Sequence, residues 1–281
     1  MNHTINIQGE LLDLSQPLVM GILNVTPDSF YQGSRMQTEK QIIGRVNEII
    51  EQGGKIIDIG AQSSNPKSEL LAVEVERERL SYALKIINKE FPDIILSVDT
   101  FYADIARFCV EEHGVAIIND ISGGELDAGM FDTVARLNVP YILMHMKGTP
   151  QTMQQMTQYG NMQQEIFYYF SEKIARLHLS GVNDIIIDPG FGFSKDVGQN
   201  YELMAHLRDF HIFELPLLVG VSRKTMIYKL LGTTPDESLN GTTVLNTYAL
   251  LNGASILRVH DVRQAVEAVA IVEQIKKYGN S

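Results

Sequence analysis

Eight short apolar runs recur along the sequence, and each is followed by a longer stretch with the spacing of an amphipathic helix. The apolar runs occupy residues 18–23, 56–59, 94–98, 115–118, 141–144, 184–187, 217–221 and 256–259. The helical stretches include residues 38–52, 72–89, 103–113, 130–137, 162–179, 201–210, 239–251 and 262–277. Runs that are apolar throughout are typical of parallel strands buried on both faces. We therefore predict an α/β protein in which strand and helix alternate eight times.

This alternation fits either a doubly wound open sheet or a closed (β/α)8 barrel. Eight nearly equal units within 281 residues favour the barrel, the TIM-barrel architecture. No Pro/Gly/Ser linker, low-complexity block or long charge run divides the chain, so we predict a single domain over residues 1–281, with its core at about 17–275. The segment INIQGELLDL, around Gly9, is expected to form a short N-terminal hairpin that closes the bottom of the barrel.

Charge and composition exclude several classes of function. The formal net charge of −11 disfavours extended binding to nucleic acid or to an anionic membrane, while a local cationic pocket remains compatible with it. The N-terminus lacks a basic and apolar targeting segment, and no apolar run approaches the roughly 20 residues of a membrane span, so we expect a cytoplasmic protein. Cys109, the only cysteine, lies in an apolar-spaced stretch that predicts a core thiol.

Polar side chains follow the predicted strands at the points where the strands end. Taken singly, a residue such as Asp99 is equally typical of a cap or a turn. In a parallel barrel, however, all the carboxyl ends meet at one rim, which is where barrel enzymes place their active sites. We therefore expect one polar site built from Asn24, Asp58, Asp99, Asn119, Asp120, His145, Asp188, Ser222, Lys224, Arg258 and His260.

The residue types divide this site into a cationic end and an acceptor end. Arg258 and His260 suit a phosphate or pyrophosphate, and the amide oxygen of Asn24 suits Mg²⁺ bridging that anion. Three acceptors suit a flat heterocycle with ring N–H and amino donors, namely Asp99, Asn119 and Asp188. The basic Ser222–Thr225 string opens a helix and could receive a carboxylate or cover a ring, although a solvent-facing Arg223 is an equal alternative.

Other motif classes are missing from the sequence. The glycine-containing loops after residues 119 and 188 match neither a P-loop nor a dinucleotide fingerprint, and no HExxH or CxxC pattern is present. His145 is either a general base or a histidine bonded to rim backbone, and we favour the second interpretation. Binding of ATP, NAD or zinc is therefore not expected.

Six motifs, in order along the chain, resemble those of the dihydropteroate synthases, a pterin-binding barrel family. They are MGILNVTPDSF (20–30), NDISGG (119–124), MHMKGTP (144–150), DPGFGF (188–193), SRK (222–224) and RVH (258–260). The resemblance implies condensation of 6-hydroxymethyl-7,8-dihydropterin pyrophosphate with p-aminobenzoate to give 7,8-dihydropteroate and pyrophosphate. It further implies a dissociative, SN1-like displacement, Mg²⁺ as cofactor and sulfonamides as inhibitors. The apolar surface predicted for the late helix, Val244 to Leu251, separately suggests a homodimer.

The resemblance also assigns roles to particular residues. It implies a pterin site formed by Asp99, Asn119, Asp188, Lys224 and Met144. It implies a pyrophosphate site formed by Asn24, Ser64, Arg258 and His260, with the metal on Asn24 and Asp58 nearby. The p-aminobenzoate site would contain Phe30, Ser64, Pro66, Lys224 and Thr225. The implied catalytic residues are Asn24, Lys224, Arg258 and His260, and mobile loops are expected after the first and second strands, at 26–33 and 63–67.

One stretch departs from the family pattern. Typical members read Gly-Gly-Glu-Ser-Thr-Arg-Pro-Gly after the second strand, whereas this chain has GAQSSNPK at 60–67, with Asn65 in place of the arginine. Two alternatives therefore stay open: a methyltetrahydrofolate-binding corrinoid methyltransferase domain, and a catalytically inactive barrel that acts as a binding partner. The SRK and RVH motifs argue against the first, and the retained polar rim argues against the second.

Overall fold

The structure is a computed structural model that describes residues 3–25, 35–62 and 70–279. Its strands are β1 (Thr4–Ile7), β2 (Glu10–Asp13), β3 (Leu18–Asn24), β4 (Ile56–Gly60), β5 (Ile95–Asp99), β6 (Ile117–Asp120), β7 (Tyr141–Met144), β8 (Ile185–Asp188), β9 (Leu218–Val219) and β10 (Ile256–Val259). Its α-helices are α1 (Arg35–Glu51), α2 (Val73–Glu90), α3 (Ala103–His113), α4 (Met130–Leu137), α5 (Met162–Ser180), α6 (Val197–Ala205), α7 (Thr225–Leu231), α8 (Leu239–Leu251) and α9 (Val262–Gly279). Short 3-10 helices are η2 (Met153–Gln155) and η3 (Leu207–Phe213).

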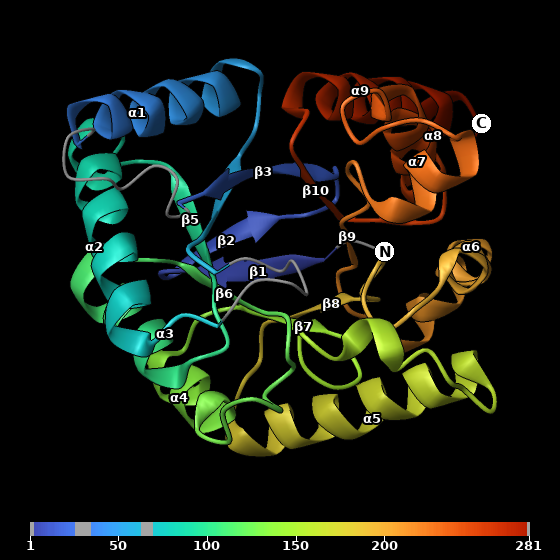
Figure 1. The fold of residues 1–281 in the computed structure, drawn as a ribbon, viewed down its shortest axis with the longest axis horizontal. Coiled ribbons are helices and arrows are strands. Elements are labelled where there is room, and N and C mark those ends of the chain that lie inside the picture. Colours follow the sequence, from blue (N-terminus) through green and yellow to red (C-terminus); the bar gives the residue numbers. More distant parts are fainter. Residues whose placement is uncertain (1–2, 26–34, 63–69, 280–281) are drawn as a thin grey trace.

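Eight parallel strands form one sheet in the order β8-β7-β6-β5-β4-β3-β10-β9. A parallel bridge between Ile187 and Leu217 joins its two edges, and the Ile187 N–H donates to the Pro216 carbonyl at 2.9 Å. The prediction of a closed barrel is therefore confirmed, and the alternative of an open doubly wound sheet is excluded. Figure 1 shows the helices as a ring around the strands. Strand β9 is shorter than expected, and Pro216 just before it lacks the N–H that would extend its ladder.

One predicted helix differs from the structure. The stretch 201–210 was expected to be a single helix, but α6 begins earlier and η3 follows it. Asp196 and Gln199 form a capping box, in which the Gln199 N–H donates to Asp196 Oδ1 at 2.8 Å and the Asp196 N–H donates to Gln199 Oε1 at 2.9 Å. This local polar signal, outside the apolar pattern, sets the start of the helix.

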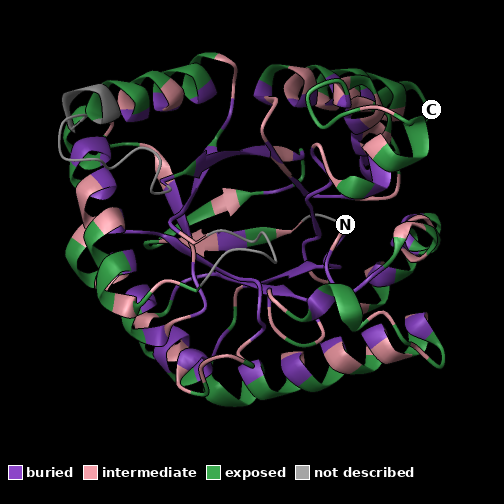
Figure 2. Cartoon of the chain, in the orientation of Figure 1, coloured by how far each residue is buried: buried purple, intermediate pink, exposed green. Residues whose placement is uncertain are grey.

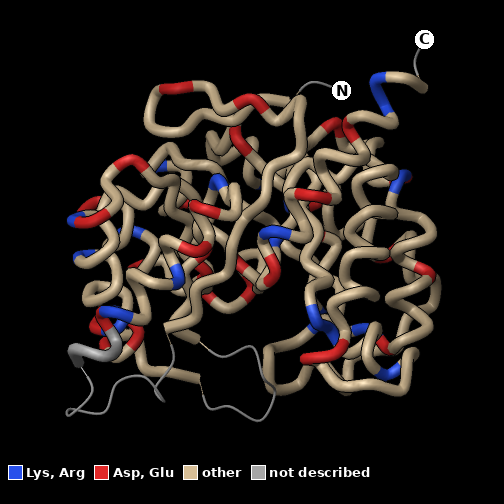
Figure 3. Tube along the Cα trace, turned by 90° about the horizontal axis from the view of Figure 1, so that it is seen from above, with Lys and Arg blue, Asp and Glu red and all other residues tan. Residues whose placement is uncertain are grey.

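The expected N-terminal hairpin is confirmed as an antiparallel pair of β1 and β2. Ile5 and Leu14 pack against the inward side chains at the amino ends of the barrel strands, including Met20, Ile56 and Ile256. The hairpin thus closes the bottom of the barrel, and the side view shows it at one end of the molecule (Figure 3). Acidic and basic residues are intermixed over the trace in that view.

The helices bury their inward faces against the barrel, and the exposed residues lie on the outer face of the ring (Figure 2). On α2 the fully buried residues Leu80, Ala83, Leu84 and Ile87 recur with helical spacing. Cys109 on α3 is free and buried, as expected of a core thiol, and burial raises the pKa of its thiol. No helix in the described ranges is long and apolar enough to cross a membrane.

Side chains two positions apart on a strand point to the same side of the sheet. In this barrel the inward side chains change from apolar to polar along the barrel axis. Inside the barrel, Ile56, Ile117 and Ile256 belong to the buried cluster at the bottom. Two residues later, Asn119 and Arg258 both donate hydrogen bonds to the carboxylate of Asp58. The barrel interior is therefore apolar at the hairpin end and polar at the carboxyl ends of the strands.

Candidate active site

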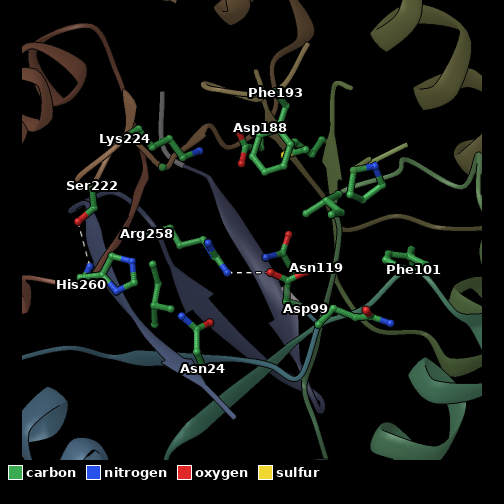
Figure 4. A pocket seen from close by; sticks show the side chains of 16 residues that line it. Asn24, Asp99, Phe101, Asn119, Asp188, Phe193, Ser222, Lys224, Arg258 and His260 are labelled. Carbon is green, nitrogen blue, oxygen red and sulfur yellow. Dashed lines mark hydrogen bonds and ion pairs between the residues drawn. The ribbon is translucent and has the colours of Figure 1, made fainter. Parts of the chain in front are cut away.

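A cavity of about 260 Å³ opens at the carboxyl ends of the strands (Figure 4). Its described lining is Ile22, Asn24, Gln62, Asp99, Phe101, Asn119, Ile121, Met144, Pro150, Asp188, Phe193, Gly220, Ser222, Lys224, Arg258 and His260. Nine of the predicted site residues are thus brought together: Asn24, Asp99, Asn119, Met144, Asp188, Ser222, Lys224, Arg258 and His260. Thr225 is exposed at the start of α7 and does not line this cavity. The predicted Phe30, Ser64 and Pro66, like Asn65, lie outside the described residues.

Asp58 lies beneath the cavity, fully buried, instead of at the rim where it was expected. Its carboxylate accepts hydrogen bonds from Ser97 Oγ at 2.6 Å, from Asn119 Nδ2 at 3.0 Å and from Arg258 Nε at 2.6 Å. Since the Asn119 amide nitrogen donates to Asp58, its oxygen is left as an acceptor for the cavity. Asp58 therefore orients two residues that line the cavity and does not line it itself.

Asp99 and Arg258 form a second ion pair above Asp58, with Arg258 Nη2 donating to Asp99 Oδ2 at 2.8 Å (Figure 4). Burial raises the pKa of Asp99 to about 7 even though the Arg258 charge acts to lower it. Burial acts to lower the pKa of Arg258, but the carboxylates of Asp58 and Asp99 outweigh it and raise that pKa. The guanidinium is thus held as a cation facing the cavity, and its Nη1 makes no hydrogen bond to a described residue.

Lys224 reaches into the cavity toward Asp188, and its Nζ lies 4.8 Å from the centroid of the Phe193 ring (Figure 4). Its ammonium donates to the Phe191 carbonyl. Burial lowers the pKa of Lys224 to about 8, and Asp188 opposes this shift. Asp188 Oδ1 accepts the Gly190 N–H at 2.8 Å, so its second oxygen remains for a donor in the cavity.

Asn24 and His260 lie at the opposite side of the cavity from Asp188 (Figure 4). The His260 backbone N–H donates to Ser222 Oγ at 3.2 Å. Burial, together with the nearby charges of Arg258 and Arg45, lowers the pKa of His260 to about 4. The imidazole is therefore neutral at neutral pH and offers one ring N–H as a donor.

The residues around Asn24 fit a divalent cation that would take most of its ligands from outside the protein. In the described part of the chain, no group of three or more His, Cys, Asp or Glu side chains is placed to hold a metal ion. The Asn24 side chain is exposed to the cavity and has no described hydrogen-bond partner. Mg²⁺ commonly takes one or two protein oxygens and completes its shell with phosphate oxygens and water.

The side chain of Arg223 is directed away from the cavity. It is paired with Asp261 through Nε at 3.0 Å and Nη2 at 2.8 Å, and its Nη1 donates to the carbonyl of Asp236 at 3.3 Å. Arg223 also has a positive φ of 55°. Its guanidinium therefore ties three loops together beside Ser222 and Lys224, a role that the tripeptide motif alone does not indicate.

Several supporting residues were not predicted to be part of the site. Buried Glu76 on α2 accepts hydrogen bonds from Thr100 Oγ1 and Gln62 Nε2, both at 2.6 Å. Gln62 Oε1 in turn accepts the Leu71 N–H at 3.1 Å. Burial raises the pKa of Glu76. The only sequence signal for this network is the glutamine at position 62, where the typical family pattern has glutamate.

Two other rim residues, Asp120 and His145, are buried and structural. Asp120 accepts the N–H groups of Ser122 at 2.7 Å and Gly124 at 2.8 Å, and thereby shapes the turn after β6. His145 Nδ1 lies 3.0 Å from the Lys195 ammonium, and His145 does not line the cavity. We expected the His145 ring to bond to rim backbone. Its Nδ1 lies against the side chain of Lys195 instead.

The fold and the cavity agree with a pterin-binding barrel enzyme, because the family model described as "Pterin binding enzyme" matches residues 20–260. The dihydropteroate synthase of Escherichia coli is 42% identical over 268 residues, which cover 95% of this chain and 94% of that protein. The crystal structure of the Yersinia pestis dihydropteroate synthase with a sulfonamide drug complex is similar with a TM-score of 0.90 and 38% identity, covering 98% of this chain and 100% of the other. A Xanthomonas albilineans dihydropteroate synthase with 4-aminobenzoic acid gives a TM-score of 0.89 at 33% identity, over 98% and 99% of the two chains. This chain belongs to the dihydropteroate synthase family, which confirms the resemblance found in the sequence motifs.

Proposed function

We propose that the chain condenses 6-hydroxymethyl-7,8-dihydropterin pyrophosphate with p-aminobenzoate to form 7,8-dihydropteroate and pyrophosphate. The observation that carries this proposal is the polarity of the cavity. Free acceptor oxygens of Asn119 and Asp188 face one part of it, and the cation Arg258 lies with Asn24 and His260 at another. A ligand that fits both parts carries ring donors at one end and negative charge at the other.

The pterin ring is expected to lie over Met144, with its amino and ring N–H groups donating to Asp188 and Asn119 and with Asp99 at its edge. Asp58 supports this arrangement because it fixes the orientation of the Asn119 amide. Phe193 and Ile121 add apolar walls for a flat ring. These contacts orient the methylene carbon toward the part of the cavity that contains Arg258.

The chemical step breaks the bond between the methylene carbon and the pyrophosphate oxygen, and the bonding electrons leave with pyrophosphate. Arg258 and the neutral His260 donate to the departing oxygens, which carry more negative charge in the transition state than in the substrate. Asn24 would hold Mg²⁺, which supplies charge neutralisation for the same leaving group when it is bound. The positive charge on the methylene carbon is delocalised into the pterin, so the displacement is dissociative.

The aniline nitrogen of p-aminobenzoate then forms the new carbon–nitrogen bond, and the acidic anilinium that results releases its proton to water. This nitrogen is already nucleophilic as the free amine, so the reaction needs no strong base to activate it. We expect Lys224, which lies beside Asp188 and over the Phe193 ring, to contact both substrates. Contacts of p-aminobenzoate and sulfonamides with Phe30, Ser64, Pro66 and Thr225 remain predictions from the family resemblance.

The direct test is formation of dihydropteroate by the purified protein from the two substrates with Mg²⁺. Absence of product from folded protein would contradict the proposal and favour the inactive barrel, and methyl transfer from methyltetrahydrofolate would instead favour the corrinoid alternative. Excess chelator should suppress turnover, and full activity in chelator would remove the metal role from Asn24.

We also infer a single-domain, cytoplasmic homodimer. All described barrel strands belong to one sheet, which supports the single domain. The exposed apolar side chains Val244 and Leu251 on α8, with Ile271 and Ile275 on α9, support association of two copies. Light scattering after size-exclusion chromatography tests the dimer, and a monomer at micromolar concentration would contradict it.

A further inference from the structure

A second lysine lies on the far side of the loop that holds Lys224. Lys195 is only 3% exposed and does not line the cavity. Its Nζ donates to the carbonyls of Gly190 and Phe193, both at 3.0 Å, and lies 3.0 Å from His145 Nδ1. The three N–H donors of a charged ammonium therefore match three acceptors that come from β8's following loop and from the end of β7.

Burying an ammonium is costly, and a core lysine is unusual without a specific set of partners. Burial lowers the pKa of Lys195 to about 7 in spite of the opposing charge of Asp188. Burial and the Lys195 charge also lower the pKa of His145 well below its usual value, which keeps the imidazole neutral and able to accept. An apolar side chain would fill the same space without this cost, so the polar pair requires an explanation beyond packing.

The partners of Lys195 identify what it holds, namely the turn at residues 190–193. Gly190 and Gly192 have φ values of 73° and 82°, and a Cβ added at Gly190 would lie 2.0 Å from the His145 carbonyl oxygen. The turn therefore packs directly on the end of β7. Ser194 adds to this attachment, because its Oγ donates to the Lys147 carbonyl at 2.7 Å.

The other side of the same turn contacts Lys224. The Phe191 carbonyl accepts a hydrogen bond from Lys224 Nζ, and the Phe193 ring lies 4.8 Å from it. Two of the groups that place Lys224 in the cavity thus belong to a turn whose carbonyls at 190 and 193 are bound by Lys195.

We propose that Lys195 and His145 form a positioning pair that holds the 190–193 turn in the conformation that places Lys224, together with Asp188, against the pterin. This inference rests on the proposed function, which assigns Lys224 to the substrates. Lys195 acts through Lys224 and touches neither substrate nor reacting atoms.

The test is a double-mutant cycle of Lys195→Met and Lys224→Met, measured as kcat/KM for the pterin substrate with wild-type turnover established first. Because small misplacements in an active site are costly, Lys195→Met should lower kcat/KM about tenfold or more in a folded protein. In the Lys224→Met background the same change should cost less than about threefold, since the group that it positions is gone. Additive losses, or wild-type kinetics in folded Lys195→Met, would overturn the proposal.

Lys173→Met is the matched control, because Lys173 is a 3% exposed lysine paired with Glu125 away from the cavity. It is expected to lower thermal stability without changing kcat/KM. If Lys195→Met does not fold, His145→Phe replaces it, since Phe keeps the ring packing against Tyr169 and removes the acceptor. A several-fold fall in kcat/KM that disappears in the Lys224→Met background supports the pair, and wild-type kinetics overturns it. A wild-type protein that forms no dihydropteroate would instead refute the proposed function.

Discussion

At the bottom of the barrel, the inward side chains Ile56 and Ile256 are fully buried under the hairpin residue Ile5. Two positions further along the same strands stand Asp58 and Arg258, which are bonded to each other at 2.6 Å. Two residues of a strand span only about 6.6 Å, so the apolar end and the charged end of the barrel interior lie close together.

Stability and activity are divided along the strands. Apolar burial at the bottom stabilises the fold without serving the cavity. Buried charges at the mouth are costly unless each finds a partner, and here Asp58, Asp99 and Arg258 satisfy one another while leaving donors and acceptors for a ligand. Substitutions at the bottom should therefore lower the free energy of unfolding, and substitutions at the mouth should lower kcat/KM. A mouth residue that also compensates a buried charge should affect both quantities.

Arg258→Met is expected to have the largest effect, and it should change both kcat/KM and the free energy of unfolding. It should lower kcat/KM about 100-fold or more, because a preorganised donor to the leaving group is lost. It should also lower the free energy of unfolding by about 3 kcal/mol, because buried Asp58 loses its cation. Steady-state kinetics and denaturant unfolding measure the two effects, with exposed Arg263→Met as the control. A folded variant within tenfold of wild type would show that Arg258 is not the leaving-group clamp.

Ile56→Ala tests the apolar packing at the bottom of the barrel. Removing a fully buried aliphatic group is expected to lower the free energy of unfolding by about 3 kcal/mol while kcat/KM stays at the wild-type value. Leu11→Ala on the hairpin is the matched control, because Leu11 is 73% exposed and its loss should have little effect. A kinetic defect in Ile56→Ala that equals its stability defect would break the proposed separation of the two ends.

The two ends of β8 allow a paired comparison of aspartates. Asp188→Asn keeps the acceptor for the Gly190 N–H but turns the free oxygen into a donor, so pterin affinity should fall by about 2 kcal/mol. Asp184→Asn is the counterpart at the bottom, where the carboxylate accepts the Asn6 N–H at 3.0 Å. Calorimetry with a pterin analogue should detect weaker binding only at position 188, and equal losses in both variants would contradict the division.

The pH dependence of kcat/KM tests the charge of Lys224. Its pKa is lowered to about 8 by burial, so the ammonium is present below this pH and is lost as pH rises through it. The profile should therefore fall on the basic side by about tenfold per pH unit above pH 8. Lys224→Arg keeps a cation over the whole range and should lack this limb. The same limb in both enzymes would assign it to another group.

Gln62→Glu should have the smallest effect and tests the network below the mouth. The new carboxyl would meet Glu76, whose Oε2 now accepts from Gln62 Nε2 at 2.6 Å. The two carboxyl groups cannot both ionise at this distance, so the pKa of the pair is raised in the folded state. The stability that is present at low pH is therefore lost as pH rises through that raised pKa. The free energy of unfolding should fall by about 1 kcal/mol between pH 6 and 8 relative to wild type. Gln52→Glu, in the exposed pair with Glu48, should show no such pH dependence.

Much of the architecture could be predicted from the sequence because a parallel barrel leaves a simple pattern. Each buried strand appears as a continuous apolar run, and the residue that ends it lies at a rim shared with the other strands. This reasoning placed Asn24, Asn119, Asp188 and Arg258 in one cavity, as the structure has them. It failed for the extent of α6, where a capping box outside the apolar pattern sets the boundary.

Which polar residue faces the ligand was decided only by the tertiary structure. Asp58 lies within one apolar run and Asp99 follows another, yet the first is buried beneath Arg258 and the second lines the cavity. Arg258 and Asp58 are 200 positions apart in the chain, and the orientation of the Asn119 amide depends on the same carboxylate. Such pairings follow from the closure of the barrel, which brings distant strands within hydrogen-bond distance. The local pattern therefore determined where polar groups gather, and contacts across the closed sheet determined which of them remain free to bind and which hold the others in place.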